Sequence, residues 1–265
     1  MPVLKVVTIN IFIDLSLWDR RRWLLVEGLS ELQPDLVALQ EVSVPADNAH
    51  WLAKQLGLSH VYQTPKAGKA GKKEAIAISS RFPFEAQGSL DLQTQDRVAQ
   101  YVKIRVGDQS VVISNGHFFW QPGESPGRQR QIERLVDWLG QVPGKQGMVI
   151  CGDFNATPDS TSIAIMRQHF TSVYAAQHGH EPEYTTPTPL PRSKLLMVRI
   201  FFEFIRYMNP TQFRLDWQGT LDYIFINSGL RVLDSQVVLN QPSQDDSTLY
   251  PSDHYGVLAV LEVVQ

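Results

Sequence analysis

Short apolar segments, many of them rich in valine and isoleucine, recur along this chain and limit the folds open to it. Branched and aromatic side chains favour extended backbone, so each such segment predicts a strand. The predicted strands cover residues 4–9, 36–40, 75–79, 98–106, 110–114, 148–151, 221–226, 231–239 and 257–263. No uninterrupted apolar stretch is long enough to span a bilayer as a helix.

Helical periodicity appears between some of these strands. Apolar residues recur near helical spacing over residues 18–32, 47–56, 129–139 and 160–169. Pro34 stops the first of these helices and Gly140 closes the third. Because strands and helices do not alternate strictly, their order favours two packed sheets with helices outside them.

The composition fits a single domain that covers residues 1–265. The chain has 265 residues, of which 43% are hydrophobic, so it can bury a large core. Its formal net charge is −3, whereas a protein that depends on non-specific binding to nucleic acid usually carries a basic surplus. The charge lowers the expectation of that class but does not exclude a nuclease, since a local patch or a bound cation can offset phosphate charge.

Cys151 is the only cysteine, so no disulfide can form within the chain. It lies in an apolar segment, where a small core residue is a better interpretation than a nucleophile. Residues 1–7 predict a strand and not a signal peptide, because they lack a basic start followed by a long apolar region. We therefore expect a reducing, cytoplasmic setting.

An apolar helical insert is predicted near residues 190–212, after a proline-rich loop. Its polar residues Arg199, Glu203 and Arg206 share one narrow stripe, as in a helix with a small wet face. The segment from Leu195 to Met208 could meet a membrane surface. Packing on the body of the protein or at a dimer contact is at least as well supported, so peripheral membrane contact is not favoured.

Polar residues stand at the ends of several predicted strands, where active sites usually lie. Taken singly, each is more often a cap or turn residue. Their joint order along the chain carries more weight than any one of them. They are Asn10, Gln40, Glu41, Glu74, His117, Asp153, Asn155, Asp222, Asp253 and His254.

This series resembles the endonuclease/exonuclease/phosphatase superfamily, a group of Mg²⁺-dependent phosphoesterases. The most specific matches are Gly152-Asp153-Phe154-Asn155 and Ser252-Asp253-His254, and the likeness extends from Asn10 to His254. It implies a four-layer α/β/β/α sandwich of two mixed sheets with helices on the outer faces. It also implies a Mg²⁺ cofactor, with Mn²⁺ as a substitute.

A hard cation held by carboxylates suits the negative charge of a phosphoryl group. By resemblance, Glu41 is the expected direct metal ligand, and Asn10 and Asp253 lie in or beside the coordination shell. Asp153 orients or deprotonates the attacking water, or helps a metal. Asn155 donates its amide to a phosphoryl oxygen or holds a carboxylate, and it points the same way as Asp153 if the backbone is extended.

Two histidine–carboxylate pairs are predicted. In the first, Asp222 fixes the tautomer of His254, which acts as a general base or stabilises the phosphate. In the second, Glu74 orients His117, which stabilises charge or protonates the leaving oxygen. The two histidine roles can also be reversed.

Basic residues near these motifs have two interpretations each. The run from Arg20 to Arg22 is better explained as a solvated helix face than as a phosphate contact. The loop that carries Lys66, Lys69, Lys72 and Lys73 is equally well explained as a substrate contact or as a mobile solubilising loop.

Nucleic acid or nucleotide is slightly favoured as the phosphodiester substrate. An alternative is a phospholipid or phosphoinositide esterase at a membrane surface; an alternative of another class is a non-catalytic interaction module on the same fold. The 5-phosphatase branch is less favoured, because its Asn-Trp-Asn motif is replaced by Thr8-Ile9-Asn10-Ile11. No obligate protein partner is implied.

Overall fold

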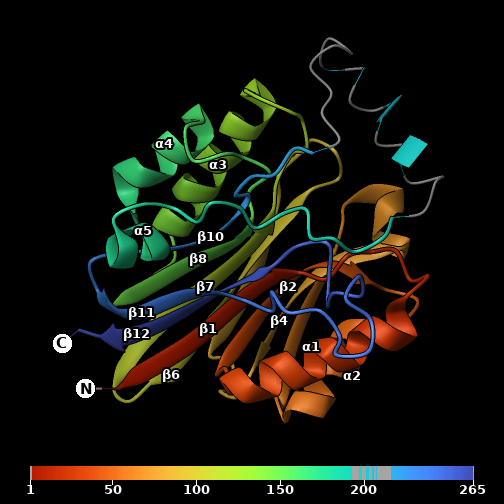
Figure 1. Cartoon of the computed structure of the whole chain (residues 1–265). Helices are drawn as coiled ribbons and strands as arrows, with labels where there is room; N and C mark the ends of the chain where they lie inside the picture. Colours follow the sequence, from red (N-terminus) through yellow and green to blue (C-terminus); the bar gives the residue numbers. More distant parts are fainter. Residues whose placement is uncertain are drawn as a thin grey trace.

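Two six-stranded mixed sheets lie face to face, with helices on their outer sides (Figure 1). The computed structural model describes residues 2–192, 197, 198, 201, 202, 205, 207 and 216–264. The predicted four-layer α/β sandwich is therefore confirmed. The apolar insert expected near residues 190–212 falls mostly outside the described residues.

The first sheet has the strand order β11-β12-β1-β2-β4-β3. Only β1 and β2 run parallel, and all its other neighbours are antiparallel. Its strands are β1 (Val3–Asn10), β2 (Leu36–Ser43), β3 (His60–Pro65), β4 (Glu74–Ser80), β11 (Leu230–Val238) and β12 (Gly256–Val263).

The second sheet repeats this pattern in the order β5-β6-β7-β8-β10-β9, with β7 and β8 as its parallel pair. Each sheet thus has one central parallel pair whose carboxyl ends lie at a common edge. Its strands are β5 (Ala86–Asp91), β6 (Val98–Val106), β7 (Gln109–His117), β8 (Gly147–Asp153), β9 (Thr171–Ser172) and β10 (Asp222–Ile226).

Helices cover both outer faces (Figure 1). The first sheet is covered by α1 (Trp18–Leu32) and α2 (Asn48–Leu56), and the second by α3 (Pro126–Gly140) and α4 (Thr161–His169). Ser125 caps α3, because its hydroxyl accepts from the backbone N–H of Arg128. A short helix, α5 (Val173–His178), and a 3₁₀ turn, η1 (Gly68–Lys72), complete these elements.

In the part of the chain that the structure describes, three large apolar cores follow from this layering: one between the sheets and one under each helical layer. A small fourth cluster holds Phe12, Leu190 and Leu249. In β2, Leu36 and Ala38 belong to the core between the sheets, whereas Val37 and Leu39 face the helices. This alternation is what a strand buried on both faces requires. Among the described residues, no helix is long and apolar enough to cross a membrane.

Edge strands account for the main differences from the predicted elements. The sequence did not predict β3 or β5, which pair with only one neighbour each. Half-buried and exposed residues make up most of both strands, so they lack the continuous apolar pattern of the central strands.

Arg21 contradicts the interpretation of residues 20–22 as a solvated face. Its side chain is 1% exposed, and its guanidinium donates to four backbone oxygens. Those oxygens belong to Ile11, Phe12, Asp14 and Pro251. Arg21 therefore ties the loop after β1 to the loop before β12, two segments that both lead into the candidate site.

Candidate active site

One end of the sandwich gathers polar side chains from both sheets. The parallel pairs end there, at Asn10 of β1 and at His117 and Asp153 of β7 and β8. The antiparallel neighbours begin there, with Glu74 at the start of β4 and Asp222 at the start of β10. Strand polarity therefore explains why residues distant in sequence meet at one place.

Asn10 links the two sheets through a single amide nitrogen. Its Nδ2 donates to Glu41 Oε1 at 3.2 Å and to Asp153 Oδ2 at 3.1 Å. Its Oδ1 accepts from the backbone N–H of Phe12 at 3.0 Å, which fixes the orientation of the amide. Asn10 therefore holds the half-buried carboxylate of Glu41 beside the buried carboxylate of Asp153, and its place in a coordination shell stays a prediction.

Burial and the charges of neighbouring acids disfavour ionisation of Asp153 and Glu41. Burial, followed by the charge of Asp222, raises the pKa of Asp153 to about 6. Burial, followed by the charges of Glu74 and Asp253, raises the pKa of Glu41. Several acids in so small a space need positive charge to ionise together.

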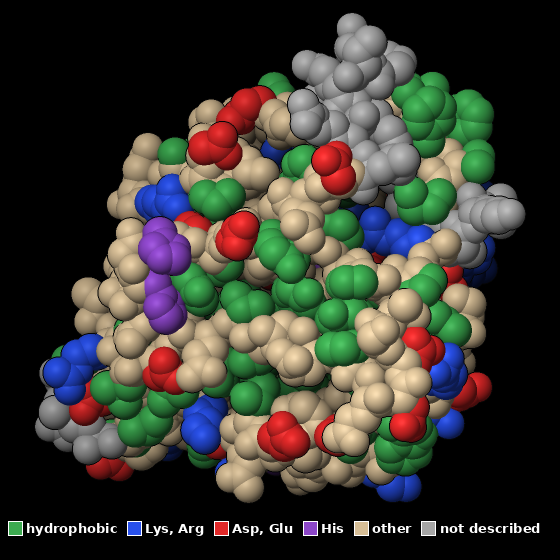
Figure 2. Space-filling model, in the orientation of Figure 1, with side chains coloured by type: hydrophobic (Ala, Val, Ile, Leu, Met, Phe, Trp, Pro, Cys, Tyr) green, Lys and Arg blue, Asp and Glu red, His purple; other side chains and the backbone are tan. Residues whose placement is uncertain are grey.

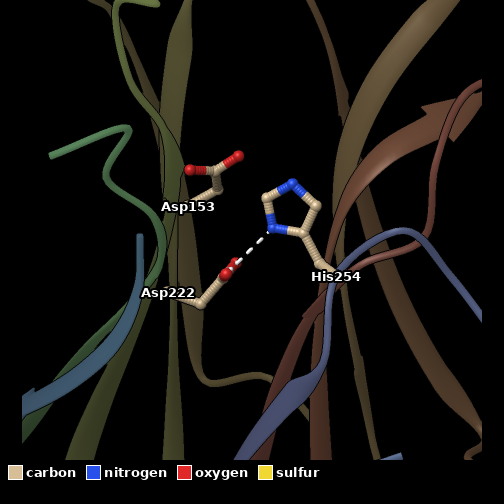
Figure 3. Close-up of side chains that lie close together, drawn as sticks. All are labelled: Asp153, Asp222 and His254. Carbon is tan, nitrogen blue, oxygen red and sulfur yellow. Dashed lines mark hydrogen bonds and ion pairs between the residues drawn. The ribbon is translucent and has the colours of Figure 1, made fainter. Parts of the chain in front are cut away.

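His254, which stands two residues before β12 of the first sheet, lies opposite Asp153 and Asp222 of the second sheet (Figure 3). Its Nδ1 is 2.9 Å from Asp222 Oδ2, and its other ring nitrogen points away from Asp222. Burial favours the neutral ring, but the charge and hydrogen bond of Asp222 outweigh it and raise the pKa of His254 to about 10. The ring is therefore an imidazolium at neutral pH when no cation is bound.

Thr185 gives this pair a third member. Its hydroxyl accepts from the backbone N–H groups of Leu221 and Asp222, so its proton is directed to Asp222 Oδ2 at 2.6 Å. Asp222 is thereby held in one orientation while it accepts from His254.

Glu74 and His117 are neighbours, but they do not form the predicted hydrogen bond. His117 Nδ1 is 3.8 Å from Glu74 Oε1, which is too long. Glu74 instead pairs with Lys66 at 2.5 Å, and His117 Nε2 lies 3.5 Å from Asp153 Oδ2. Burial, followed by the charges of Arg97 and Lys66, lowers the pKa of His117 well below its usual range, so this ring is neutral.

Asn155 does not follow Asp153 in an extended backbone, and Asp253 forms an ion pair of its own. Asn155 has a φ of 49°, and its backbone N–H turns back to Asp153 Oδ1 at 2.9 Å. Its side-chain amide donates to the carbonyl of Phe118, so Asn155 and Asp153 are not aligned as on a strand. Asp253 pairs with Arg192 at 2.8 Å through Oδ2.

Arg97 is a functional candidate that the sequence analysis missed. It is 8% exposed, and its Nε and Nη1 are buried without a hydrogen-bond partner among the described residues. Burial lowers its pKa, while the nearby Glu74 and Asp153 counteract this. A buried guanidinium without a bonded acid is suited to an anionic ligand. The sequence could have indicated Arg97 as a site candidate, because it stands immediately before the predicted strand at 98–106.

The donor set fits a divalent cation. Carboxylate oxygens of Glu41 and Asp153 both accept from the side-chain amide of Asn10. Asp222 Oδ1 is buried without a hydrogen-bond partner in the described part of the chain. Asp153, Asp222 and His254 also bring ligand atoms within 4.8 Å of one another. Clustered carboxylate oxygens are the ligands of hard cations, so this cluster could hold a metal ion.

Comparison with known proteins identifies the family. The model of the Endonuclease/Exonuclease/phosphatase family matches residues 7–254. The chain is 25% identical to Protein angel of Drosophila melanogaster, covering 93% of this chain and 73% of that protein. It is 24% identical to human Nocturnin, covering 91% of this chain but only 57% of that protein. It is 22% identical to the CCR4-Not complex 3'-5'-exoribonuclease subunit Ccr4 of Kluyveromyces lactis, covering 93% of this chain and 38% of that protein.

Solved structures show the same fold. TDP2 of D. rerio, complexed with single strand DNA product, superposes with a TM-score of 0.76 at 15% identity, covering 98% of this chain and 99% of that chain. The human Nocturnin catalytic domain with a bound sulfate anion gives 0.75 at 21% identity, covering 99% and 94%. With strand-end residues, fold and family model in agreement, this chain belongs to the endonuclease/exonuclease/phosphatase family.

Proposed function

We propose that this protein is a Mg²⁺-dependent phosphoesterase that hydrolyses a phosphodiester, with Mn²⁺ as a substitute. The observation that carries the proposal is the single cluster in which Asn10 joins Glu41 to Asp153 and His254 lies opposite Asp153. Carboxylates, an imidazolium and Arg97, two of whose nitrogens have no hydrogen-bond partner among the described residues, match the needs of phosphoryl transfer. We also propose that the chain acts as a single catalytic domain.

Each side chain is given one role in this mechanism. A cation bound by Glu41, with Asp153 or Asp253, would neutralise charge on the phosphoryl group. Asp153, whose pKa is raised to about 6, is ionised at neutral pH and orients or deprotonates the attacking water. Charged His254 donates to a phosphoryl oxygen, which favours its stabilising role over that of a general base.

His117 and Arg97 act on the other side of the cluster. His117 is held neutral, so it donates a hydrogen bond and does not serve as a strong acid. Arg97 supplies fixed positive charge to the phosphate. Lys66 neutralises Glu74, which supports the interpretation of its loop as part of the site over that of a mobile solubilising loop.

Arg97→Gln is expected to raise KM by about tenfold or more with a smaller change in kcat, because a charge-assisted bond to phosphate is lost. Steady-state kinetics on one phosphodiester substrate measures both constants. Arg105→Gln is the matched control, since Arg105 pairs with Glu85 on the surface. An unchanged KM in Arg97→Gln would remove Arg97 from the site.

The charge state of His254 gives a pH prediction. In EDTA, its ring protons should titrate near pH 10 by NMR, and Asp222→Asn should lower this midpoint because the raising interactions are lost. Since the folded pKa exceeds the ordinary 6.5, the pair stabilises the fold fully below pH 6.5 and loses this contribution as the pH rises through 10. Asp222→Asn should therefore destabilise the protein at pH 7 more than at pH 10.5, and equal losses would contradict the pairing.

Nucleic acid or nucleotide is the proposed substrate class. Relatives named as a 3'-5'-exoribonuclease subunit and as a complex with single strand DNA product support it. Figure 2 shows acidic and basic side chains interspersed on the visible face, so binding is expected to depend on the site more than on a broad basic surface. The reducing, cytoplasmic setting remains a proposal from the single, buried cysteine.

A substrate panel tests this choice. DNA, RNA, a dinucleotide, a phosphoinositide and sphingomyelin are each incubated with the full chain and Mg²⁺. The proposal predicts the highest kcat/KM on a nucleic acid or nucleotide. Preference for either lipid would support the membrane alternative, and no turnover on any of them would support a non-catalytic module.

A further inference from the structure

A backbone irregularity in β2 brings Glu41 into the site. Up to Leu39 the strand alternates regularly, with even-numbered residues facing the other sheet and odd-numbered residues facing the helices. Regular continuation would place Gln40 inward and Glu41 outward, among the helices. A carboxylate on that outer side could not reach Asn10.

Both residues face inward instead. Gln40 donates to Asn115 of the second sheet, and Glu41 accepts from Asn10. Val42 returns to the helical core, so the alternation has shifted by one residue. The pairing shows the same shift, because Leu39 lies opposite Ala77 and Val42 opposite Ala75.

These features define a β-bulge at Gln40 and Glu41, where two residues of β2 lie opposite one residue of β4. Glu41 has a φ of 56°, a left-handed conformation that costs a residue with a side chain about 1–2 kcal/mol. Such a conformation persists only where surrounding contacts enforce it. The position of Glu41 therefore depends on whatever holds the bulge.

We infer that Asn115, on β7 of the opposite sheet, is the positioning residue that holds this bulge. Its Nδ2 donates to the carbonyls of Leu39 at 2.9 Å and Ala77 at 3.0 Å, the last regular pair before the bulge. Its Oδ1 accepts from Gln40 Nε2 at 2.7 Å. One fully buried side chain thus binds both strands and the first residue of the bulge.

The chemistry of this contact is specific to an asparagine. Two donors and one acceptor are needed at once, and the Asn115 amide provides all three. Leucine matches its size but provides none of them. Asn115 acts on the reaction only through Glu41, so the inference rests on the proposed role of Glu41 as a cation ligand.

The test is the affinity of the whole chain for Mn²⁺, measured by isothermal titration calorimetry. Asn115→Leu is expected to raise the Kd by about tenfold or more, since misplacing one carboxylate ligand costs at least about 1.4 kcal/mol. Gln100→Leu is the matched control. Gln100 is the cross-strand neighbour of Asn115 and also joins the two sheets, but through the carbonyl of Tyr62 on β3.

Both variants are expected to lower Tm, whereas only Asn115→Leu is expected to change the Kd. Should Asn115→Leu fail to fold, Gln40→Met keeps both donations from Asn115 Nδ2 and removes the Gln40–Asn115 bond, together with the bonds from Gln40 to Thr8 Oγ1 and the Ala38 carbonyl; it is expected to raise the Kd severalfold. Folded variants that bind Mn²⁺ as tightly as the wild type would overturn the inference and leave the proposed function standing. Absence of Mn²⁺ binding by the wild type would overturn both.

Discussion

His254→Gln is expected to lower kcat by about a thousandfold, the largest effect of any single substitution in this site. The glutamine keeps a donor but removes the positive charge that His254 holds through Asp222. Loss of the stabilising pair with Asp222 should lower the Tm, but His254 belongs to none of the apolar cores, so the variant should remain folded. Steady-state kinetics with the circular dichroism spectrum and Tm of the same preparation measure both properties.

His50→Gln is the matched control for this substitution. His50 also pairs with an aspartate, since its Nδ1 is 2.6 Å from Asp47 Oδ1, but that pair lies on the surface. Its kcat should equal that of the wild type. Turnover within threefold of the wild type in folded His254→Gln would show that His254 has no role in the reaction.

Glu41→Gln is expected to have the second largest effect, a loss of cation binding. The neutral amide keeps the size of the side chain but removes the charge that would attract Mg²⁺ into the cluster. The Kd for Mn²⁺ should rise by about a hundredfold, and kcat at fixed Mg²⁺ should fall accordingly. Raising the Mg²⁺ concentration should restore part of the activity.

Glu181→Gln controls for the loss of a buried glutamate elsewhere. The Glu181 side chain is 5% exposed and pairs with Arg167, outside the cluster. It should bind Mn²⁺ as the wild type does. Equal Mn²⁺ affinity in Glu41→Gln and in the wild type would show that Glu41 is not a metal ligand and that other residues, such as Asp153 with Asp222, bind the cation.

The ends of the central strands were predictable, because a buried strand is apolar along its length and its apolar pattern stops where the strand ends. Asn10, His117 and Asp153 each follow such a segment, and the structure has each of them as the last residue of its strand. The two-sheet sandwich and the family are confirmed as well. These features depend on local pattern and chain order, which the sequence contains.

Other features depend on contacts between distant segments and could not be predicted. The left-handed backbone at Glu41 is held by Asn115 from the opposite sheet. Arg21 was assigned to the surface because it lies among charged residues, yet loop carbonyls surround it. Lys66, which directly follows the neighbouring edge strand β3 and is not on β7, pairs with Glu74, whereas His117 lies 3.8 Å from it.

Hydrolysis of bis-p-nitrophenyl phosphate by the full chain tests the central claim most directly. With Mg²⁺ or Mn²⁺ present, release of p-nitrophenolate should be readily measured. Excess EDTA should abolish it, and added Mn²⁺ should restore it. Turnover that persists in EDTA would contradict a cation-dependent site, and no turnover under any of these conditions would contradict the assignment as a phosphoesterase.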